Sequence, residues 1–122
     1  MSAKNFSDSL RQETELEISV KGRRTGKARS TTVWFAHEGD KVYLLPVKGS
    51  DTEWYKNVLK DPNVTLTVGG KSLQAKANPI VKPDPVRRVI ELFAGKYGGM
   101  REINRWYSKL DVAVEIPIAK TA

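Results

Sequence analysis

Short runs in which apolar and polar residues alternate recur along this chain, and they constrain its fold more than any other feature. Residues 15–21 alternate strictly, so Leu16, Ile18 and Val20 would share one face of a strand. Five more runs have the alternation or the β-branched and aromatic composition of strands: 30–36, 41–47, 63–68, 71–77 and 112–116. The links between them are too short for repeated parallel crossovers, so neighbouring strands should pair antiparallel. A small barrel, closed or split, would leave few exposed sheet edges.

Four segments between and beside the strands have the apolar spacing of helices. The first is 2–13, where Phe6 and Leu10 lie four residues apart. A capping-box pattern at Ser50 predicts a helix that ends at Asp61-Pro62. Asp84-Pro85 predicts the N-cap and first turn of a helix that ends at Gly98-Gly99, before a short last helix. The apolar stripes of the last three helices contain Trp54, Tyr55, Val58, Leu59, Val86, Val89, Ile90, Phe93, Ile103 and Trp106.

The predicted fold is therefore mainly β (α+β): a small antiparallel split β-barrel of about six strands with peripheral helices. The length of 122 residues fits one domain, 1–122. The 39% hydrophobic content suits a thin barrel, or one that completes its core by dimerising.

Composition also excludes several kinds of chemistry. The chain has no cysteine, which rules out disulfides, thiol catalysis and iron–sulfur clusters, and the single histidine, His37, argues against an imidazole metal site. We therefore predict no metal and interpret His37 as a surface residue. No apolar run approaches the length of a membrane span, and the N-terminus lacks a secretory signal, so we expect a cytoplasmic protein.

The positive charge is concentrated in one glycine-containing loop. The chain carries net +7, and the five cations of residues 21–29 account for all but +2 of it. Gly22 and Gly26 would let the loop turn sharply and expose backbone amides to an anion, while arginine forks suit phosphate or carboxylate oxygens. Ala28 stands where a Walker loop needs a hydroxyl. The charge alone leaves three interpretations: a solvated loop, a nucleic-acid contact, or an anion site for a small ligand.

Three segments together resemble a known family. Residues 22–29 read Gly-Arg-Arg-Thr-Gly-Lys-Ala-Arg, residues 47–50 read Val-Lys-Gly-Ser, and residues 54–62 read Trp-Tyr-Lys-Asn-Val-Leu-Lys-Asp-Pro. Their order and spacing resemble the deazaflavin (F420)-dependent nitroreductase family, within the superfamily of FMN-binding split β-barrels that includes pyridoxamine-phosphate oxidases. The resemblance covers about residues 15 to 80. Val47, Ser50 and Thr32 depart from residues common in that family.

The resemblance implies a cofactor site. The phosphate and acidic tail of coenzyme F420 would be held by Arg23, Arg24, Thr25, Gly26, Lys27 and Arg29. The tricyclic ring would be flanked by Lys48 and Gly49, with the backbone of Pro46 and Val47, and bordered by Trp54 and Asn57. Tyr97, Trp106 and Tyr107 would resemble the family's substrate-side wall, with helix packing as the alternative role for them.

The function implied is that of an oxidoreductase that moves hydride from reduced F420 to an electron-poor acceptor such as a quinone, an enone or a nitro compound. A hydride-carrying cofactor suits a chain without evident acid–base machinery. Five loop cations exceed what the single phosphate of FMN needs, which favours F420 over FMN. An FMN-dependent flavin reductase, a non-catalytic carrier and a nucleic-acid-binding barrel remain as alternatives, the last disfavoured because no aromatic residue interrupts the basic run. The superfamily resemblance implies a homodimer.

Overall fold

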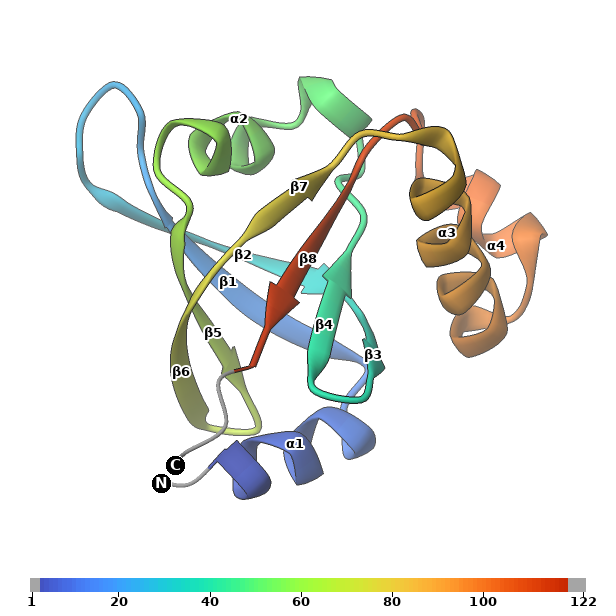
Figure 1. The fold of residues 1–122 in the computed structure, drawn as a ribbon, viewed down its shortest axis with the longest axis horizontal. Helices are drawn as coiled ribbons and strands as arrows, with labels where there is room; N and C mark the ends of the chain where they lie inside the picture. Colours follow the sequence, from blue (N-terminus) through green and yellow to red (C-terminus); the bar gives the residue numbers. More distant parts are fainter. Residues whose placement is uncertain (1–2, 119–122) are drawn as a thin grey trace.

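The computed structural model describes residues 3–118. They form two four-stranded antiparallel sheets, which are joined where the chain bends from one sheet into the other (Figure 1). One sheet has the strand order β2-β1-β5-β6 and the other β3-β4-β8-β7. The strands are β1 Glu15–Lys21, β2 Ala28–Trp34, β3 Ala36–Glu38, β4 Lys41–Leu44, β5 Asn63–Val68, β6 Lys71–Lys76, β7 Asn78–Ile80 and β8 Ala113–Pro117. The helices are α1 Ala3–Gln12, α2 Glu53–Lys60, α3 Pro83–Tyr97 and α4 Met100–Trp106, with a single 3₁₀ turn, η1, at Gly49–Asp51.

The predicted antiparallel split barrel is confirmed. Residues 3–118 form eight strands instead of the six predicted, because the chain bends at two places. The run predicted over 30–36 breaks at Phe35 into β2 and β3, which belong to different sheets. The chain likewise passes from β6 through Ala77, the last residue of the predicted run, into β7, which lies beyond that run. Phe35 and Ala77 are both fully buried. Each bent segment thus takes part in both sheets, which joins their edges around one core.

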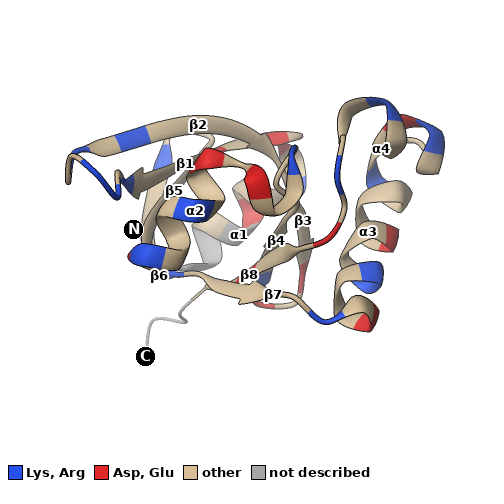
Figure 2. Ribbon diagram, turned by 90° about the horizontal axis from the view of Figure 1, so that it is seen from above, with Lys and Arg blue, Asp and Glu red and all other residues tan. Residues whose placement is uncertain are grey.

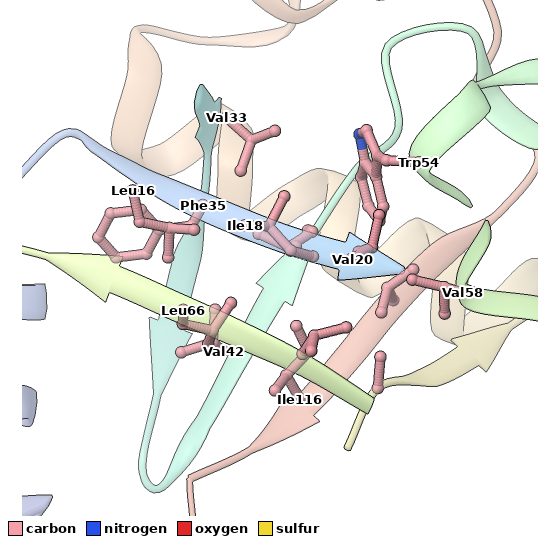
Figure 3. Close-up of a cluster of buried hydrophobic side chains, with 14 of the residues drawn as sticks. Leu16, Ile18, Val20, Val33, Phe35, Val42, Trp54, Val58, Leu66 and Ile116 are labelled. Atoms are coloured by element: carbon pink, nitrogen blue, oxygen red, sulfur yellow. The ribbon is translucent and has the colours of Figure 1, made fainter. Parts of the chain in front are cut away.

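The alternating residues fill the interior of the barrel. Leu16, Ile18 and Val20 point inward from β1 as predicted, and Leu66 and Ile116 meet them from β5 and β8 (Figure 3). The core is closed at one end by α1, through Phe6 and Leu10, and at the other by α2, through Trp54, Tyr55 and Val58 (Figure 1). A second apolar cluster lies between the sheets and the pair α3 and α4, around Phe93 and Ile103.

Two helix starts differ from the prediction. Thr52 precedes α2 as its N-cap, because Ser50 is held within η1, where its hydroxyl donates to Asp111 Oδ2 at 2.6 Å. The capping box at Ser50 was therefore wrong. Similarly, α3 begins at Pro83, which puts Asp84 in the first turn instead of at the N-cap. Leu59 of the predicted stripe is also 57% exposed. The predicted end of α3 is confirmed at Gly98, whose φ of 95° needs glycine. None of the described helices is long and apolar enough to cross a bilayer.

Two side chains of α3 form hydrogen bonds with the backbone N–H and C=O groups of Phe35, at the bend between β2 and β3. The Tyr97 hydroxyl accepts a hydrogen bond from Phe35 N at 3.0 Å and lies within donating distance of Phe35 O (2.8 Å) and Thr14 O (2.7 Å). Lys96 Nζ also donates to Phe35 O, at 3.0 Å, and lies 3.5 Å from the centroid of the Phe35 ring. Burial raises the pKa of Tyr97 to about 12, so its hydroxyl keeps the proton that it donates.

Replacing Tyr97 with phenylalanine should weaken the fold by about 1–3 kcal/mol, because the buried Phe35 N–H would lose its acceptor. Urea denaturation of the wild type and of Tyr97→Phe measures the difference. Tyr43→Phe is the matched control, since the Tyr43 hydroxyl makes no hydrogen bond within residues 3–118. Equal midpoints for both variants would show that the Tyr97 hydroxyl does not hold the bend.

Candidate functional site

Two cavities lie side by side where the barrel is split, between β2 and the segment that leads from β4 into α2. The wide cavity has a volume of about 640 Å³ and the loop cavity one of about 260 Å³, and Glu53 borders both. The wide cavity is lined by Glu15, Thr31, Thr32, Val33, Trp34, Leu45, Val47, Lys48, Asp51, Thr52, Glu53, Trp54, Trp106 and Tyr107. The loop cavity is lined by Gly22, Arg23, Arg24, Thr25, Arg29, Glu53 and Asn57.

Aromatic side chains from β2 and from the end of α4 form one wall of the wide cavity. Trp34, at the end of β2, stacks on Tyr97 with 4.2 Å between ring centroids and 6° between planes. Trp106 meets Trp34 edge-on at 6.4 Å, and Tyr107 lies 6.1 Å from it. Burial raises the pKa of Tyr107, so its phenol stays protonated. Trp106 is 54% exposed, so this wall offers flat apolar surface to a ligand.

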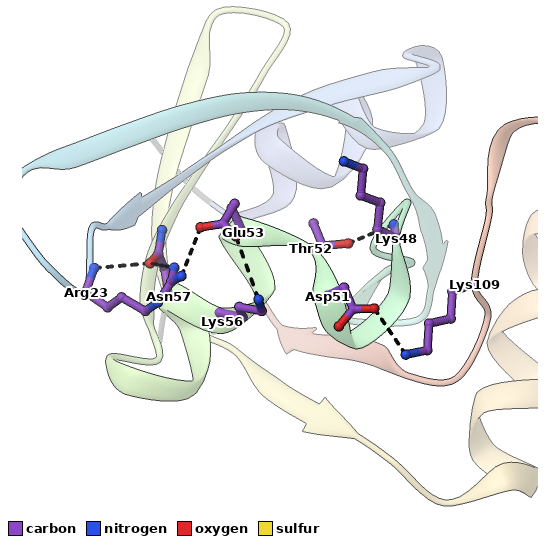
Figure 4. A network of polar contacts seen from close by, with 8 residues as sticks. All are labelled: Arg23, Lys48, Asp51, Thr52, Glu53, Lys56, Asn57 and Lys109. Atoms are coloured by element: carbon purple, nitrogen blue, oxygen red, sulfur yellow. Dashed lines mark hydrogen bonds and ion pairs between the residues drawn. The ribbon is translucent and has the colours of Figure 1, made fainter.

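The opposite wall, residues 47–52, is fixed by hydrogen bonds at both ends (Figure 4). Lys48 N donates to Thr52 Oγ1 at 2.8 Å, and Ser108 N donates to Val47 O at 2.9 Å. Ser50 N donates to Asp111 Oδ1 at 2.9 Å, besides its hydroxyl bond to the same carboxylate. Burial would raise the pKa of Asp111, but the hydrogen bonds from Ser50, a backbone hydrogen bond at Asp111 itself and the charge of Lys109 together lower that pKa. The wall is therefore held in place before any ligand arrives.

Arg23 is tied to α2 through both its backbone and its side chain. Its backbone N and its Nη1 donate to Asn57 Oδ1 at 3.1 and 2.8 Å, and its Nη2 donates to Glu53 Oε1 at 2.9 Å (Figure 4). Asn57 is only 4% exposed, so its amide is a fixed anchor. The loop is docked on the barrel through Arg23.

The predicted nest of exposed amides is reduced, because the amides of Gly22, Arg23, Gly26 and Lys27 already have hydrogen-bond partners. Gly22 N donates to Lys27 O and Gly26 N to Gly22 O, both at 2.8 Å, and Lys27 N donates to Thr25 Oγ1 at 3.2 Å. The side chains are different: Arg24, Lys27 and Arg29 are exposed and form no ion pair within residues 3–118. Figure 2 marks Lys and Arg positions of the loop between β1 and β2 in blue. Anion binding at this loop would therefore rest on side-chain cations.

The structure brings most of the predicted site residues to the two cavities. Val47, Lys48, Trp54, Trp106 and Tyr107 line the wide one, and Arg23, Arg24, Thr25, Arg29 and Asn57 line the loop cavity. Five do not line either: Gly26, Lys27, Pro46, Gly49 and Tyr97. Pro46 and Gly49 are buried supports of the wall, and Tyr97 lies behind Trp34.

Sequence reasoning missed Trp34 and Glu53 as site residues. In the sequence, Trp34 is an aromatic residue within a predicted strand, and Glu53 is the last residue of the predicted capping box. Neither pattern carries a signal for a cavity, since the cavity forms only where β2, the start of α2 and the end of α4 come together in the folded chain. His37 lies on β3 with its Nε2 buried and unpaired among the described residues, and burial lowers its pKa. It lines neither cavity, and its ring is half-buried, so it is less exposed than the predicted surface histidine.

Comparison with known proteins gives the family. The model of the F420H(2)-dependent quinone reductase family matches residues 5–117. An F420H(2)-dependent quinone reductase of Mycobacterium tuberculosis (strain H37Rv) is 32% identical over 73 residues, which are 57% of this chain and 49% of that protein. A putative F420H(2)-dependent quinone reductase of Mycobacterium bovis matches equally. The match thus spans about half the length of these relatives.

Solved structures share the fold at low identity. An F420-H2-dependent reductase, FDR-A, has a TM-score of 0.68 at 21% identity, covering 85% of this chain and 94% of that one. A putative pyridoxamine 5'-phosphate oxidase of Listeria innocua has a TM-score of 0.69 at 13% identity, covering 93% and 90%. A chain solved as a domain-swapped dimer has a TM-score of 0.68 at 20% identity, covering 93% and 94%. The resemblance stated from the three motifs is confirmed, and this chain belongs to the F420H(2)-dependent quinone reductase family.

Proposed function

We propose that this protein binds coenzyme F420 and uses its reduced form to reduce an electron-poor acceptor, with quinones as the first class to test and enones and nitro compounds as the next. One observation carries the proposal: an aromatic-walled cavity of about 640 Å³ adjoins a cavity bordered by cations, with only Glu53 shared between them. A flat ring joined to an anionic tail needs such a pair of sites. Membership of the family supports the same cofactor.

The proposed roles follow from where the side chains lie. Val47, Lys48 and Trp54 would border the ring in the wide cavity, with Gly49 and Pro46 holding that wall. In the loop cavity, Arg24 and Arg29 would bind the phosphate, and exposed Lys27 would extend the positive surface for the acidic tail. Reduced F420, when bound, supplies a hydride from C5 of its deazaflavin ring.

The chain's own contribution would be to orient the reactants and exclude water. Trp34, Trp106 and Tyr107 would form the acceptor's side of the wide cavity, where a planar quinone can pack on their rings. The protonated Tyr107 phenol could donate a hydrogen bond to an oxygen of the bound quinone.

A binding titration separates the candidate cofactors. Protein is titrated into F420, FMN and a deazaflavin that lacks the phosphate and tail, and ligand fluorescence is followed. We expect F420 to bind tightest and the phosphate-free compound about 10- to 100-fold more weakly, because charge-assisted contacts would be lost. Firm retention of FMN without F420 binding would instead support the flavin reductase.

Turnover is then measured by adding menadione to protein and reduced F420 and following the return of the oxidised coenzyme's absorbance. Protein-dependent oxidation is the expected result. Tight binding without reduction of a quinone, an enone or a nitro compound would favour the non-catalytic carrier over the enzyme.

A homodimer is proposed as well. The free edge of β2 and the exposed Trp106 and Val47 border the open side of the wide cavity, where a second copy could cover it. One structural neighbour is a domain-swapped dimer. Light scattering on the purified chain tests this. The cytoplasmic location stays a prediction from composition.

A further inference from the structure

Glu53 stands at the junction of the two cavities. It is the first residue of α2 and, among residues 3–118, the one residue that lines both. Its side chain is 73% exposed, yet its carboxylate is engaged: Oε1 accepts from Arg23 Nη2 at 2.9 Å. A negative charge in this place lies on the path that joins a ring in one cavity to an anionic group in the other.

Arg23 has two partners of unequal mobility. The buried amide of Asn57 binds Nη1 and the Arg23 backbone, and these two bonds keep the residue on α2 whatever Glu53 does. The bond from Nη2 to Glu53 is made to an exposed side chain that can turn away. A guanidinium offers five donors in a rigid fork, so an anion can take the place of Glu53 without breaking the bonds to Asn57.

Glu53 also has a second cation at hand. Lys56 Nζ lies 3.8 Å from Glu53 Oε2, one helical turn further along α2 (Figure 4). When Glu53 leaves Arg23, its carboxylate can keep a positive partner and stay in solvent, so the release costs little. The hydrogen bond with Arg23 lowers the pKa of Glu53, so the carboxylate stays charged at neutral pH and well into the acidic range.

We propose that Glu53 is a built-in competitor for the anionic part of the cofactor: it occupies Arg23 in the empty protein and is displaced when a phosphate enters the loop cavity. Glu53 would thereby lower cofactor affinity and speed release, while it keeps Arg23 ordered between turnovers. The ligand class rests on the proposed function. The competition itself requires only an anion of phosphate type.

The first test compares the F420 affinity of the wild type, Glu53→Gln and Asp84→Asn by fluorescence titration. Glutamine keeps the shape of Glu53 and removes its charge, so we expect Glu53→Gln to bind F420 about three- to tenfold tighter. Asp84→Asn makes the same change in net charge on α3, outside both cavities, where Asp84 pairs with Arg87. It should change affinity less than twofold. Unchanged or weaker binding by Glu53→Gln would overturn the proposal.

The gain should also depend on Arg23. In an Arg23→Gln background, Glu53→Gln should no longer tighten binding, because the cation under competition is gone. Thermal unfolding of each variant shows that the fold is retained. A gain that persists without Arg23 would mean that Glu53 acts by general repulsion, which would refute a competitor for this arginine.

The second test uses inorganic pyrophosphate and does not depend on F420. Arginine side-chain NMR signals of the labelled protein are followed during the titration, and those of Arg23 should move at several-fold lower pyrophosphate in Glu53→Gln than in the wild type. If the wild type fails to bind F420 and this shift still appears, the proposed function fails while the role of Glu53 stands. If F420 binds and neither assay separates Glu53→Gln from the wild type, the role of Glu53 is refuted.

Discussion

Replacing both Arg24 and Arg29 with alanine should weaken F420 binding by about 3–6 kcal/mol, or roughly 10²- to 10⁴-fold. Both side chains line the loop cavity, are exposed and have no ion pair within residues 3–118, so their donors are available to a ligand. Each would lose a charge-assisted hydrogen bond to phosphate or carboxylate oxygens. The free energy of unfolding should change by no more than about 0.5 kcal/mol, because the residues make no contact that the fold needs.

Fluorescence titration of F420 measures this effect, and the double variant Arg11→Ala with Arg87→Ala is the matched control. It removes the same two charges from arginines that pair with Asp8 and Asp84, away from the loop. We expect its affinity to stay within a few-fold of the wild type at moderate salt. An equal loss in both double variants would reduce the loop's role to long-range attraction, and no loss in Arg24→Ala/Arg29→Ala would refute the loop as the anion site.

The choice of Arg24 and Arg29 comes from the structure. From the sequence, Arg23 looks like the equal of Arg24, but its guanidinium is already bonded to Asn57 and Glu53. Removing the Arg23 side chain would break two of the three hydrogen bonds that Arg23 makes to α2 and mix a folding effect with a binding effect. The two free arginines report on binding alone.

Replacing Gly49 with alanine should cost about 3–5 kcal/mol of stability and abolish the ordered wall of the wide cavity. Gly49 has φ +55°, where a side chain is strained. A Cβ there would also overlap Asp111 Oδ1 and come within 2.9 Å of Lys109 Cγ. The carboxylate that binds Ser50 would have to move, and its two hydrogen bonds would be lost.

Gly39→Ala separates these causes. Gly39 has a similar φ of +61°, and nothing lies within 4 Å of the position its Cβ would take. It should cost only the backbone strain, about 1–2 kcal/mol. Urea denaturation gives the stabilities, and F420 titration shows whether the wide cavity survives. Equal losses of stability in the two variants would mean that the Asp111 carboxylate can move aside at no cost, so that the wall does not require glycine at position 49.

The bends show how far local patterns predict this fold. The alternation in β1 and β5 survives unchanged, because inward residues of these strands meet one core along their whole length. The run over 30–36 predicts a single strand, since nothing local marks Phe35 as a corner. The corner is stable because Tyr97 and Lys96, about 60 residues later, supply the hydrogen bonds that the ladder gives up.

By itself the sequence determined the strands, the split-barrel class, the family and the loop that holds most of the excess charge, because each of these depends on the order of nearby residues. The tertiary structure decided which of the loop's cations remain free. Arg23 is engaged by Glu53 and Asn57, which lie 30 and 34 residues further along the chain. It also brought Trp34 to the cavity wall against Tyr97. Contacts between residues so far apart arise only when β2, α2 and α3 pack together, so no local pattern could have shown them.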